Sequence, residues 1–377
     1  MKLILVPFIL MCFFNSSDTQ DSKRTLFNLL IGTYTSSGKS EGIYVYNFNS
    51  QTGEFSYKSK AAGVENPSYL AISHDKKHVY SVNEVREGGI SAFAFNSISG
   101  DITFLNRVSS GGSGPCYVST DDAGKYVFAA NYTSGSLCAI PVLEDGSLGN
   151  SIQFIQHEGS SIDKSRQEKP HIHSAILSPD NRYLFTPDLG TDKVNIYRLD
   201  PAQLSNPLSP AEQSFAMVKA GSGPRHMAFH PNSKFAYVIQ EMEGSITVFD
   251  YENGKLTYKQ LISMLSPGFN GKIYAADVHV SPDGKFLYGS NRGDANEIVT
   301  YSIKKNGELA YAGRQSTLVK TPRNFVIDPT GNFLLVGNQS SDEIVIFKRD
   351  QKTGLLTPTG KKIQVSAPVC LKFVPSD

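Results

Sequence analysis

Three arginines in this sequence stand in similar local surroundings and suit chemistry on an anionic small molecule. Arg225 and Arg323 each follow a proline, and Arg292 follows Asn291. A guanidinium binds a carboxylate or a phosphate through two parallel hydrogen bonds, and it can also stabilise a developing oxyanion. Because one structural ion pair explains one such arginine better than three, we expect the three to converge on a ligand.

Histidine and glutamate side chains elsewhere in the chain could move protons beside these arginines. His171 and His173 stand in a Pro-His-Ile-His segment, His226 directly follows Arg225, and Glu241 follows an apolar run. A well-placed general base of this kind typically contributes about 10²–10⁴-fold to a rate. The sequence therefore offers Glu241 and neutral His173 as alternative bases that could activate a water molecule.

A metal site is not expected from these residues. His171 and His173 are not expected to share one zinc ion, and no cysteine pair has metal-ligand spacing. A ring of oxygen ligands would in principle suit calcium, and its members would be Asn131, Asp188, Glu241 and Asn291. The nearby arginines would repel a cation, so we expect neither a metal nor another cofactor. The sequence also lacks a Gly-rich phosphate loop and the HExxH and GxSxG motifs.

The overall composition excludes several classes of protein. The 377 residues include 36 Lys and Arg against 35 Asp and Glu, so the net charge of +1 creates no general attraction to nucleic acid or to an anionic membrane. A hydrophobic fraction of 40% is too high for a disordered chain. Aromatic residues make up 11% of the chain and charged residues only 19%, a profile that favours β structure.

Residues 1–20 have the pattern of an export signal. A short charged start precedes an apolar run at 3–14, and the following six residues are polar. The run is too short to cross a bilayer, so no membrane span is expected. The alternative is a buried N-terminal strand, but Pro7 and the missing alternation argue against it. We expect an exported protein, periplasmic or extracellular, in which residues 21–377 form the folded domain.

The cysteines add little chemistry. Cys12 lies in the export signal and is a weak candidate for lipid attachment, because Met11 is larger than the residue that usually precedes such a cysteine. The three remaining cysteines form no disulfide framework and are interpreted as small buried apolar residues. They are Cys116, Cys138 and Cys370.

A repeat of about fifty residues organises the chain. Each copy contains an apolar strand, a Pro-Asp-Gly-like turn and a second strand that ends in a polar residue. The six complete copies have their turns at Asp75, Asp122, Asp180, Asn232, Asp283 and Thr330. A third strand and a short fourth strand follow, and four strands per repeat is typical of a β-propeller blade. Periodicity of 3.6 residues is nearly absent, which argues against a helical repeat.

The two ends of the chain complete each other. A seventh copy at 370–376 contains only a first strand, whereas the segments 29–34 and 42–46 look like second and third strands that lack a first one. Pairing these segments would remove two free sheet edges. We therefore predict an all-β fold: a seven-bladed β-propeller of four-stranded antiparallel blades, closed by a composite blade from both termini.

The blade pattern brings the candidate residues to one place. First strands line the central channel of a propeller, and the loops at their ends form a funnel. Residues at the start of first strands should therefore meet residues that follow second strands, and the two groups together are His171, His173, Arg225, His226, Arg323, Asn131, Glu241 and Arg292. The insertion at 158–169 is expected to be a mobile loop over the funnel mouth, with a solvated linker as the alternative.

Four longer segments carry a resemblance to a known family. They are GSGPRHMAFHP at 221–231, HSAILSPDN at 173–181, SPDGKFLYGSNR at 281–292 and PRNFVIDP at 322–329. In combination they resemble the lactonase family of seven-bladed propellers, which contains bacterial 6-phosphogluconolactonases and fungal carboxy-cis,cis-muconate cyclases. The resemblance covers nearly all of the chain after the export signal.

This resemblance implies a lactone hydrolase that opens a sugar lactone without a metal. It places the catalytic residues at His173, Arg225, Glu241 and Arg292. Substrate-binding roles are then expected for His171, His226, Arg323 and Asn131. The export signal is a departure, because sugar-phosphate lactones are cytosolic, so the substrate is expected to be a different and unphosphorylated lactone.

Two other functions use the same residues. A muconate-type cycloisomerase would bind carboxylates with the arginines and move a proton with a histidine or glutamate. A non-catalytic propeller would bind an anionic sugar or peptide in the funnel. In each case the partner is a small molecule or peptide rather than nucleic acid, and the chain is expected to be a monomer.

Overall fold

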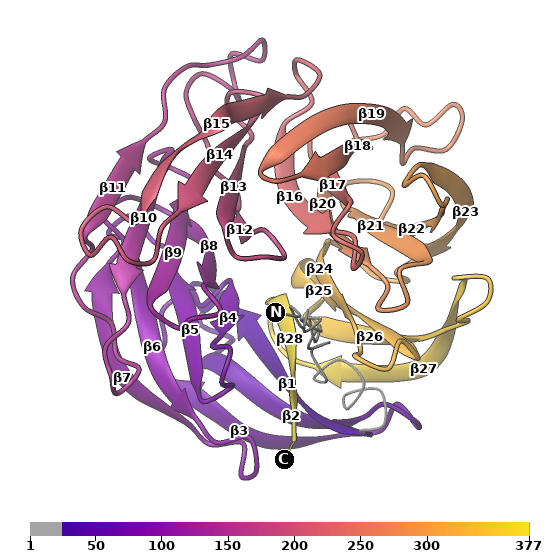
Figure 1. Ribbon diagram of the computed structural model, residues 1–377. Helices are drawn as coiled ribbons and strands as arrows, with labels where there is room; N and C mark the ends of the chain where they lie inside the picture. Colours follow the sequence, from indigo (N-terminus) through magenta and orange to yellow (C-terminus); the bar gives the residue numbers. More distant parts are fainter. Residues whose placement is uncertain (1–24, 377) are drawn as a thin grey trace, which may run out of the picture.

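Seven four-stranded sheets surround a central axis in the computed structural model, which describes residues 25–376 (Figure 1). Every pair of neighbouring strands within a sheet is antiparallel, and six of the sheets use four consecutive strands. The seventh sheet has the order β28-β1-β2-β3 and therefore joins the two ends of the described chain. The predicted seven-bladed propeller is confirmed.

The first two strands of each blade lie nearest the axis. The innermost strands are β28 (Pro368–Pro375), β4 (Leu70–Ile72), β8 (Pro115–Thr120), β12 (Ile176–Leu177), β16 (Pro224–Phe229), β20 (Ala275–Val280) and β24 (Pro322–Ile327). The second strands are β1 (Leu26–Thr33), β5 (His78–Asn83), β9 (Tyr126–Asn131), β13 (Tyr183–Asp188), β17 (Phe235–Gln240), β21 (Phe286–Asn291) and β25 (Phe333–Asn338).

The outer two strands of each blade form the rim of the ring. The third strands are β2 (Gly42–Asn49), β6 (Gly89–Phe95), β10 (Ser136–Pro141), β14 (Lys193–Leu199), β18 (Ser245–Glu252), β22 (Glu297–Ile303) and β26 (Glu343–Arg349). The fourth strands are β3 (Phe55–Ala62), β7 (Ile102–Ser109), β11 (Gln153–Gln156), β15 (Leu208–Met217), β19 (Lys255–Ser263), β23 (Leu309–Ser316) and β27 (Leu356–Gln364). A 3₁₀ turn, η1 (Gln339–Ser341), follows β25.

Burial explains why the second strands are mostly apolar and why the fourth strands contain both polar and apolar residues. β17, β21 and β25 are buried at every position, because the blades on either side cover both faces. The fourth strand β15 is largely exposed and carries polar residues. This gradient matches the repeated pattern of an apolar run followed by a mixed one.

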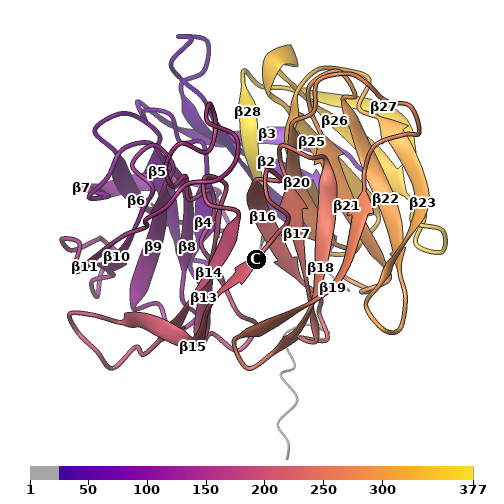
Figure 2. The same ribbon diagram turned by 90° about the horizontal axis from the view of Figure 1, so that it is seen from above.

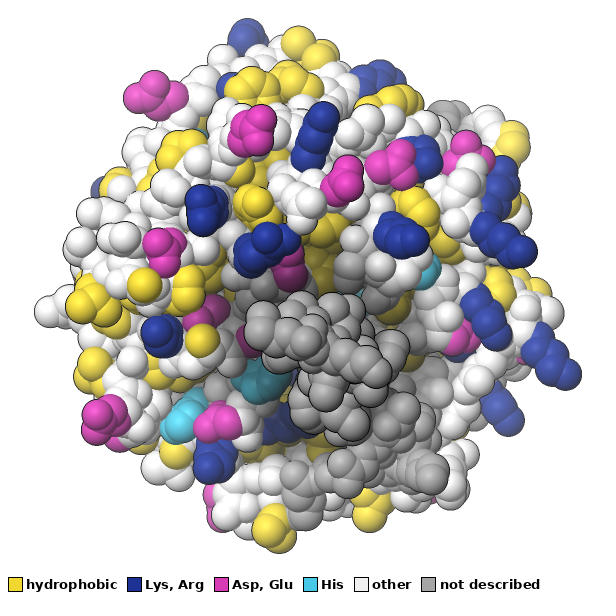
Figure 3. Space-filling view, in the orientation of Figure 1, with side chains coloured by type: hydrophobic (Ala, Val, Ile, Leu, Met, Phe, Trp, Pro, Cys, Tyr) yellow, Lys and Arg dark blue, Asp and Glu magenta, His cyan; other side chains and the backbone are white. Residues whose placement is uncertain are grey.

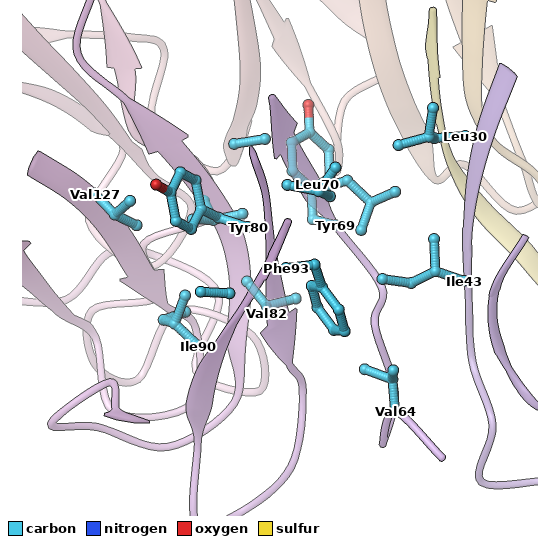
Figure 4. Close-up of a cluster of buried hydrophobic side chains, with 14 of the residues drawn as sticks. Leu30, Ile43, Val64, Tyr69, Leu70, Tyr80, Val82, Ile90, Phe93 and Val127 are labelled. Carbon is cyan, nitrogen blue, oxygen red and sulfur yellow. The ribbon is translucent and has the colours of Figure 1, made fainter. Parts of the chain in front are cut away.

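Six clusters of buried side chains pack each blade against the next all the way round the ring. The largest cluster spans three blades, and it includes Leu30 from β1, Tyr80 from β5 and Val127 from β9 (Figure 4). Another cluster joins the composite blade to the β24–β27 blade through Phe48 and Leu335. A single blade could not bury its apolar side chains alone, because its two faces pack against two different neighbouring blades.

The ring closes through a hydrogen-bonded pairing of the two ends. Cys370 in β28 lies opposite Gly32 in β1, in an antiparallel register that runs along both strands. Figure 2 shows β28 standing beside the strands of the first blade, far from it in sequence. The predicted composite blade is therefore confirmed.

Removing residues 368–377 should abolish cooperative melting and make the protein aggregate. The truncation deletes β28, exposes the edge of β1 and removes the buried side chains of Val369 and Leu371 from the core. Thermal unfolding followed by circular dichroism and light scattering measures this effect. Adding a synthetic peptide of residues 368–377 should restore cooperative melting, whereas an unchanged transition in the truncated protein would contradict the closure.

The expected export signal and Cys12 lie outside the described residues. Within residues 25–376, no helix is long and apolar enough to cross a membrane.

Candidate active site

The starts of the inner strands line a funnel into which side chains from separate blades project. In five blades the first residue of the inner strand pairs with the last residue of the second strand, so Arg225 and Arg323 stand at equivalent levels. Rings from non-adjacent blades meet at this end of the channel. The ring centroid of His226 lies 5.4 Å from that of Tyr117 and 5.8 Å from that of Tyr69.

Glu241 is the centre of the predicted cluster and lies directly after β17. Its Oε2 accepts hydrogen bonds from Arg225 Nε at 2.9 Å and from Arg292 Nη2 at 3.0 Å. Its Oε1 accepts a hydrogen bond from Arg166 Nη2 at 2.8 Å. Three guanidinium groups thus surround one buried carboxylate.

These arginines decide the protonation state of Glu241. Burial alone would raise the pKa of this carboxyl, but the charges of Arg292, Arg225 and Arg166 outweigh burial and lower the pKa to about 2. A carboxylate with so low a pKa is a poor proton acceptor near neutral pH. Its geometry instead suits it to hold the arginines in place.

Each of two arginines keeps one terminal nitrogen available for a ligand. Arg225 is 1% exposed, and its Nη1 donates to the carbonyl of Ala276 at 2.5 Å and to His226 Nε2 at 3.2 Å. Arg292 donates from Nε to the carbonyl of Tyr274 at 3.0 Å. Arg225 Nη2 and Arg292 Nη1 have no hydrogen-bond partner among residues 25–376.

His226, which is expected to bind substrate, contacts Arg225 and Asp277 in the structure. Its Nδ1 lies 2.8 Å from Asp277 Oδ1 and donates to it, while Nε2 accepts from Arg225. Burial and the neighbouring Arg225 lower the pKa of His226 to about 4, so the ring is neutral at physiological pH. Both ring nitrogens are occupied, and neither is free to meet a ligand.

His173 has the free imidazole nitrogen of the cluster. It is 5% exposed, and its ring packs edge-on against His226 and Tyr132, with centroids 5.4 and 5.3 Å apart. Nδ1 lies 3.7 Å from Cys116 Sγ, and Nε2 has no hydrogen-bond partner in the described part of the chain. Burial and the charge of Arg225 lower the pKa of His173 well below 6.5, which keeps the ring neutral and able to accept a proton.

His171 and Asn131, which are expected to bind substrate, both contact neighbouring groups of the protein. His171 stacks on Tyr132 with centroids 4.6 Å apart, and its ring nitrogens lie 3.0 Å from the Tyr132 carbonyl and 3.2 Å from Glu168 Oε1. Asn131 is fully buried and donates to the carbonyl of Ser110 and to Ser136 Oγ. An asparagine at a strand end commonly satisfies neighbouring polar groups in this way.

The insertion at 158–169 reaches Glu241 in the funnel, and hydrogen bonds hold it to itself and to the neighbouring blade. Asp163 Oδ1 accepts from the backbone nitrogens of Ser165 and Arg166, and the buried Gln167 donates to the Leu189 carbonyl at 2.9 Å. These contacts aim Arg166 at Glu241. Sequence reasoning missed Arg166, because nothing distinguishes it from the other charged residues of the insertion.

Two further funnel residues escaped the sequence analysis. Tyr34 and Glu84 directly follow β1 and β5, the position that Glu241 has after β17. Tyr34 donates to Glu84 Oε2 at 2.7 Å, and the Arg323 guanidinium lies 5.5 Å from the Tyr34 ring centroid. The blade repeat could have identified both positions, because each residue directly follows the second strand of its blade, as Glu241 does.

Two members of the oxygen ring considered for calcium, Asp188 and Glu241, accept hydrogen bonds from donors of the protein. Asp188 accepts from the backbone nitrogens of His171 and Gly190, and its Oδ2 lies 2.8 Å from His157 Nδ1. Among residues 25–376, no group of three or more His, Cys, Asp or Glu residues is arranged to hold a metal ion. Cys116, Cys138 and Cys370 are free and buried, as interpreted from the sequence.

The end of the ring that Figure 3 displays carries charged side chains of both signs. Figure 3 shows Lys, Arg, Asp and Glu side chains spread over the face that it displays, with Lys and Arg more frequent along its right-hand margin.

Comparison with known proteins agrees with this architecture. The family model described as a seven-bladed β-propeller lactonase matches residues 28–373, from β1 into β28. The chain belongs to the lactonase family. Because the match reaches from one end of the ring to the other, the composite closing blade is part of the family fold.

Named lactonases resemble the chain over almost its whole length. The 6-phosphogluconolactonase of Bacillus subtilis is 38% identical over 347 residues, which cover 91% of this chain and 97% of that protein. A crystal structure of a putative 6-phosphogluconolactonase from Bacteroides fragilis has 41% identity and a TM-score of 0.89, with coverage of 93% and 98%. The periplasmic gluconolactonase of Pseudomonas aeruginosa has 39% identity and a TM-score of 0.90, with coverage of 94% and 100%.

Proposed function

We propose that this lactonase-family protein hydrolyses a sugar lactone. The observation that carries the proposal is a free, neutral imidazole nitrogen on His173 in the same funnel as two arginines with unused terminal nitrogens. Lactone hydrolysis needs a base for water and donors for the developing oxyanion. The lactonase names of the similar proteins support the same reaction.

The proposed reaction begins with His173 Nε2 taking a proton from water. The resulting hydroxide attacks the carbonyl carbon of the lactone, and the oxyanion of the tetrahedral intermediate accepts hydrogen bonds from Arg225 and Arg292. The bond between that carbon and the ring oxygen then breaks. The imidazolium of His173 returns its proton to the leaving oxygen, which gives an open hydroxy acid that ionises.

In this mechanism Glu241 and His226 are positioning residues. Glu241 fixes the guanidinium planes of Arg225 and Arg292, and His226 holds Arg225 from the other side. Removing the fork of hydrogen bonds would leave the arginines charged but misaligned, and alignment is what makes such donors effective.

We further propose that the protein is exported and acts as a monomer on an unphosphorylated aldonolactone. Residues 1–20 carry the pattern of an export signal, and the similar Pseudomonas aeruginosa gluconolactonase is periplasmic. All the groups named above come from one chain, so the site needs no second copy. Glucono-δ-lactone is a natural first candidate for such a substrate.

Proton release tests this function directly. The purified protein should accelerate acid production from glucono-δ-lactone above the spontaneous rate, and a parallel assay with 6-phosphoglucono-δ-lactone measures any preference for a phosphate. A muconate lactone, followed by ultraviolet absorbance, tests for cycloisomerisation. Failure to accelerate opening of every lactone tried would reject the hydrolase proposal and leave binding of an anion as the function to pursue.

A further inference from the structure

A second polar centre lies in the same funnel as Glu241, and the charges of Arg323 and Glu241 act on each other. Glu241, Arg225 and Arg292 come from the β16–β19 and β20–β23 blades, whereas Arg323, Tyr34 and Glu84 come from the next three blades around the ring (Figure 1). The charged side chains of this second centre make fewer contacts with the protein than the arginines around Glu241 do. Its charged groups are only partly satisfied.

Glu84 has one oxygen held by the protein and one oxygen open. Oε2 accepts hydrogen bonds from the hydroxyls of Tyr34 and Ser68. Oε1 has no hydrogen bond or ion pair with any residue in the described range 25–376. Burial raises the pKa of Tyr34, so its hydroxyl keeps its proton and fixes the orientation of the carboxylate. A half-buried carboxylate fixed on one side offers its other oxygen to a hydroxyl donor.

Arg323 has its full set of guanidinium donors open. The guanidinium lies over the Tyr34 ring, and it makes no hydrogen bond or ion pair with any described residue. This differs from Arg225 and Arg292, which both donate to Glu241. An arginine carries five N–H donors, and a partly buried one usually finds partners for most of them.

Arg323 and Glu84 influence each other electrostatically, but no nitrogen–oxygen pair between them reaches ion-pair distance. Tyr34 stands between the two, bonded to one and stacked under the other. A group that both donates and accepts hydrogen bonds could bridge this gap. A sugar hydroxyl does both, because it donates to a carboxylate and accepts from a guanidinium.

We propose that Glu84, Tyr34 and Arg323 form a hydroxyl-reading site that makes the enzyme selective for polyhydroxylated lactones. This inference rests on the hydrolase function proposed above. With the lactone carbonyl at His173, other hydroxyl groups of the substrate would bind at the second centre, whose Arg323 lies near enough for its charge to act on His173. A site built around open polar groups discriminates against a ligand that lacks the matching hydroxyls, since those groups are then desolvated without partners.

The test compares two lactones with the same six-membered ring. Glucono-δ-lactone carries hydroxyl groups, and δ-valerolactone carries none. For Glu84→Gln, the ratio of kcat/KM values between the two lactones should fall by about 10- to 100-fold, because a hydrogen bond to a charged group is lost. Tyr34→Phe keeps the ring under Arg323 but frees Glu84, so it should shift the ratio in the same direction by less.

Glu87→Gln is the matched control, because Glu87 is exposed in the loop that contains Glu84. It should leave both rates unchanged. Equal losses on the two lactones in Glu84→Gln would overturn the proposal and assign Glu84 to the fold or to the chemistry. A wild-type protein without preference for glucono-δ-lactone would overturn it as well.

Calorimetric binding of gluconate separates this inference from the hydrolase proposal. If the wild-type protein opened no lactone, the hydrolase proposal would fail, and weaker gluconate binding by Glu84→Gln would still support the hydroxyl-reading site. Gluconate binding that is equal in wild type and Glu84→Gln would overturn that site, whatever the result with lactones.

Discussion

Replacing Glu241 with glutamine should lower kcat/KM for the lactone substrate by about 10²-fold or more. Glutamine keeps the shape of the side chain but loses the charge that aligns Arg225, Arg292 and Arg166. The loss should appear mainly in kcat, because the arginines act on the oxyanion of the transition state. Initial rates of proton release at several lactone concentrations separate kcat from KM.

The same substitution should also lower the melting temperature, since an unpaired buried charge typically costs about 3–5 kcal/mol. The pKa of Glu241 is lowered to about 2, so its contribution to stability is present above the ordinary pKa of 4.5 and is lost as the pH falls towards 2. The gap in melting temperature between wild type and variant should therefore close in acid. A gap that stayed constant would show that the charge of Glu241 is not the cause.

Glu243→Gln is the matched control for this experiment. Glu243 lies two residues from Glu241 and pairs with Lys219 on the surface. Its substitution should change activity and melting little, as expected for an exposed ion pair. Turnover of folded Glu241→Gln should be measured well below its melting temperature. If it were near normal, the reaction would have to take place elsewhere in the funnel.

The sequence was sufficient to predict the fold because the repeat appears in the local sequence of the six blades that are built from four consecutive strands. An aspartate in the turn between the first two strands accepts hydrogen bonds from a nearby serine and from the backbone, as in Ser281 with Asp283 and Ser178 with Asp180. The second strand that follows is apolar because neighbouring blades cover both of its faces. Ring closure was predictable because an unpaired first strand at one end matched a missing first strand at the other.

The candidate site was only partly predictable. Blade position placed His173, Arg225, Glu241 and Arg292 in one funnel, and their contacts agree with that placement. The division of roles depends on individual hydrogen bonds, which no repeat encodes. His226 has the same blade offset as Asn324, yet both of its nitrogens are taken by Asp277 and Arg225.

Residues outside the repeat were the hardest to assign. Arg166 reaches Glu241 from an insertion that the other blades lack, so no blade-to-blade comparison indicates its role. The repeat could have indicated the positions of Glu84 and Tyr34, but the residues that follow the second strands vary in type from blade to blade. Their importance emerges only from the unsatisfied Arg323 beside them.

Replacing His173 with asparagine should lower kcat by about 10²–10⁴-fold, the usual contribution of a general base. The asparagine amide fills part of the same space but cannot accept a proton from water. The lowered pKa of His173 adds a second expectation: the imidazole stays neutral below pH 6.5, so wild-type kcat/KM should not fall between pH 7.5 and about pH 6 as it would for an ordinary histidine base. Rates corrected for spontaneous hydrolysis at each pH provide the profile.

His230→Asn is the appropriate comparison for this variant. His230 directly follows the far end of the inner strand β16 and contacts the carbonyl of Gly284, away from the funnel mouth where Arg225 begins that strand. It should retain wild-type turnover. If His173→Asn instead kept normal kcat, His173 would not be the base, and Glu241 would be the remaining candidate. A carboxyl with a pKa of about 2 cannot accept a proton efficiently. The contacts of Glu241 with its three arginines would then have to rearrange when substrate binds.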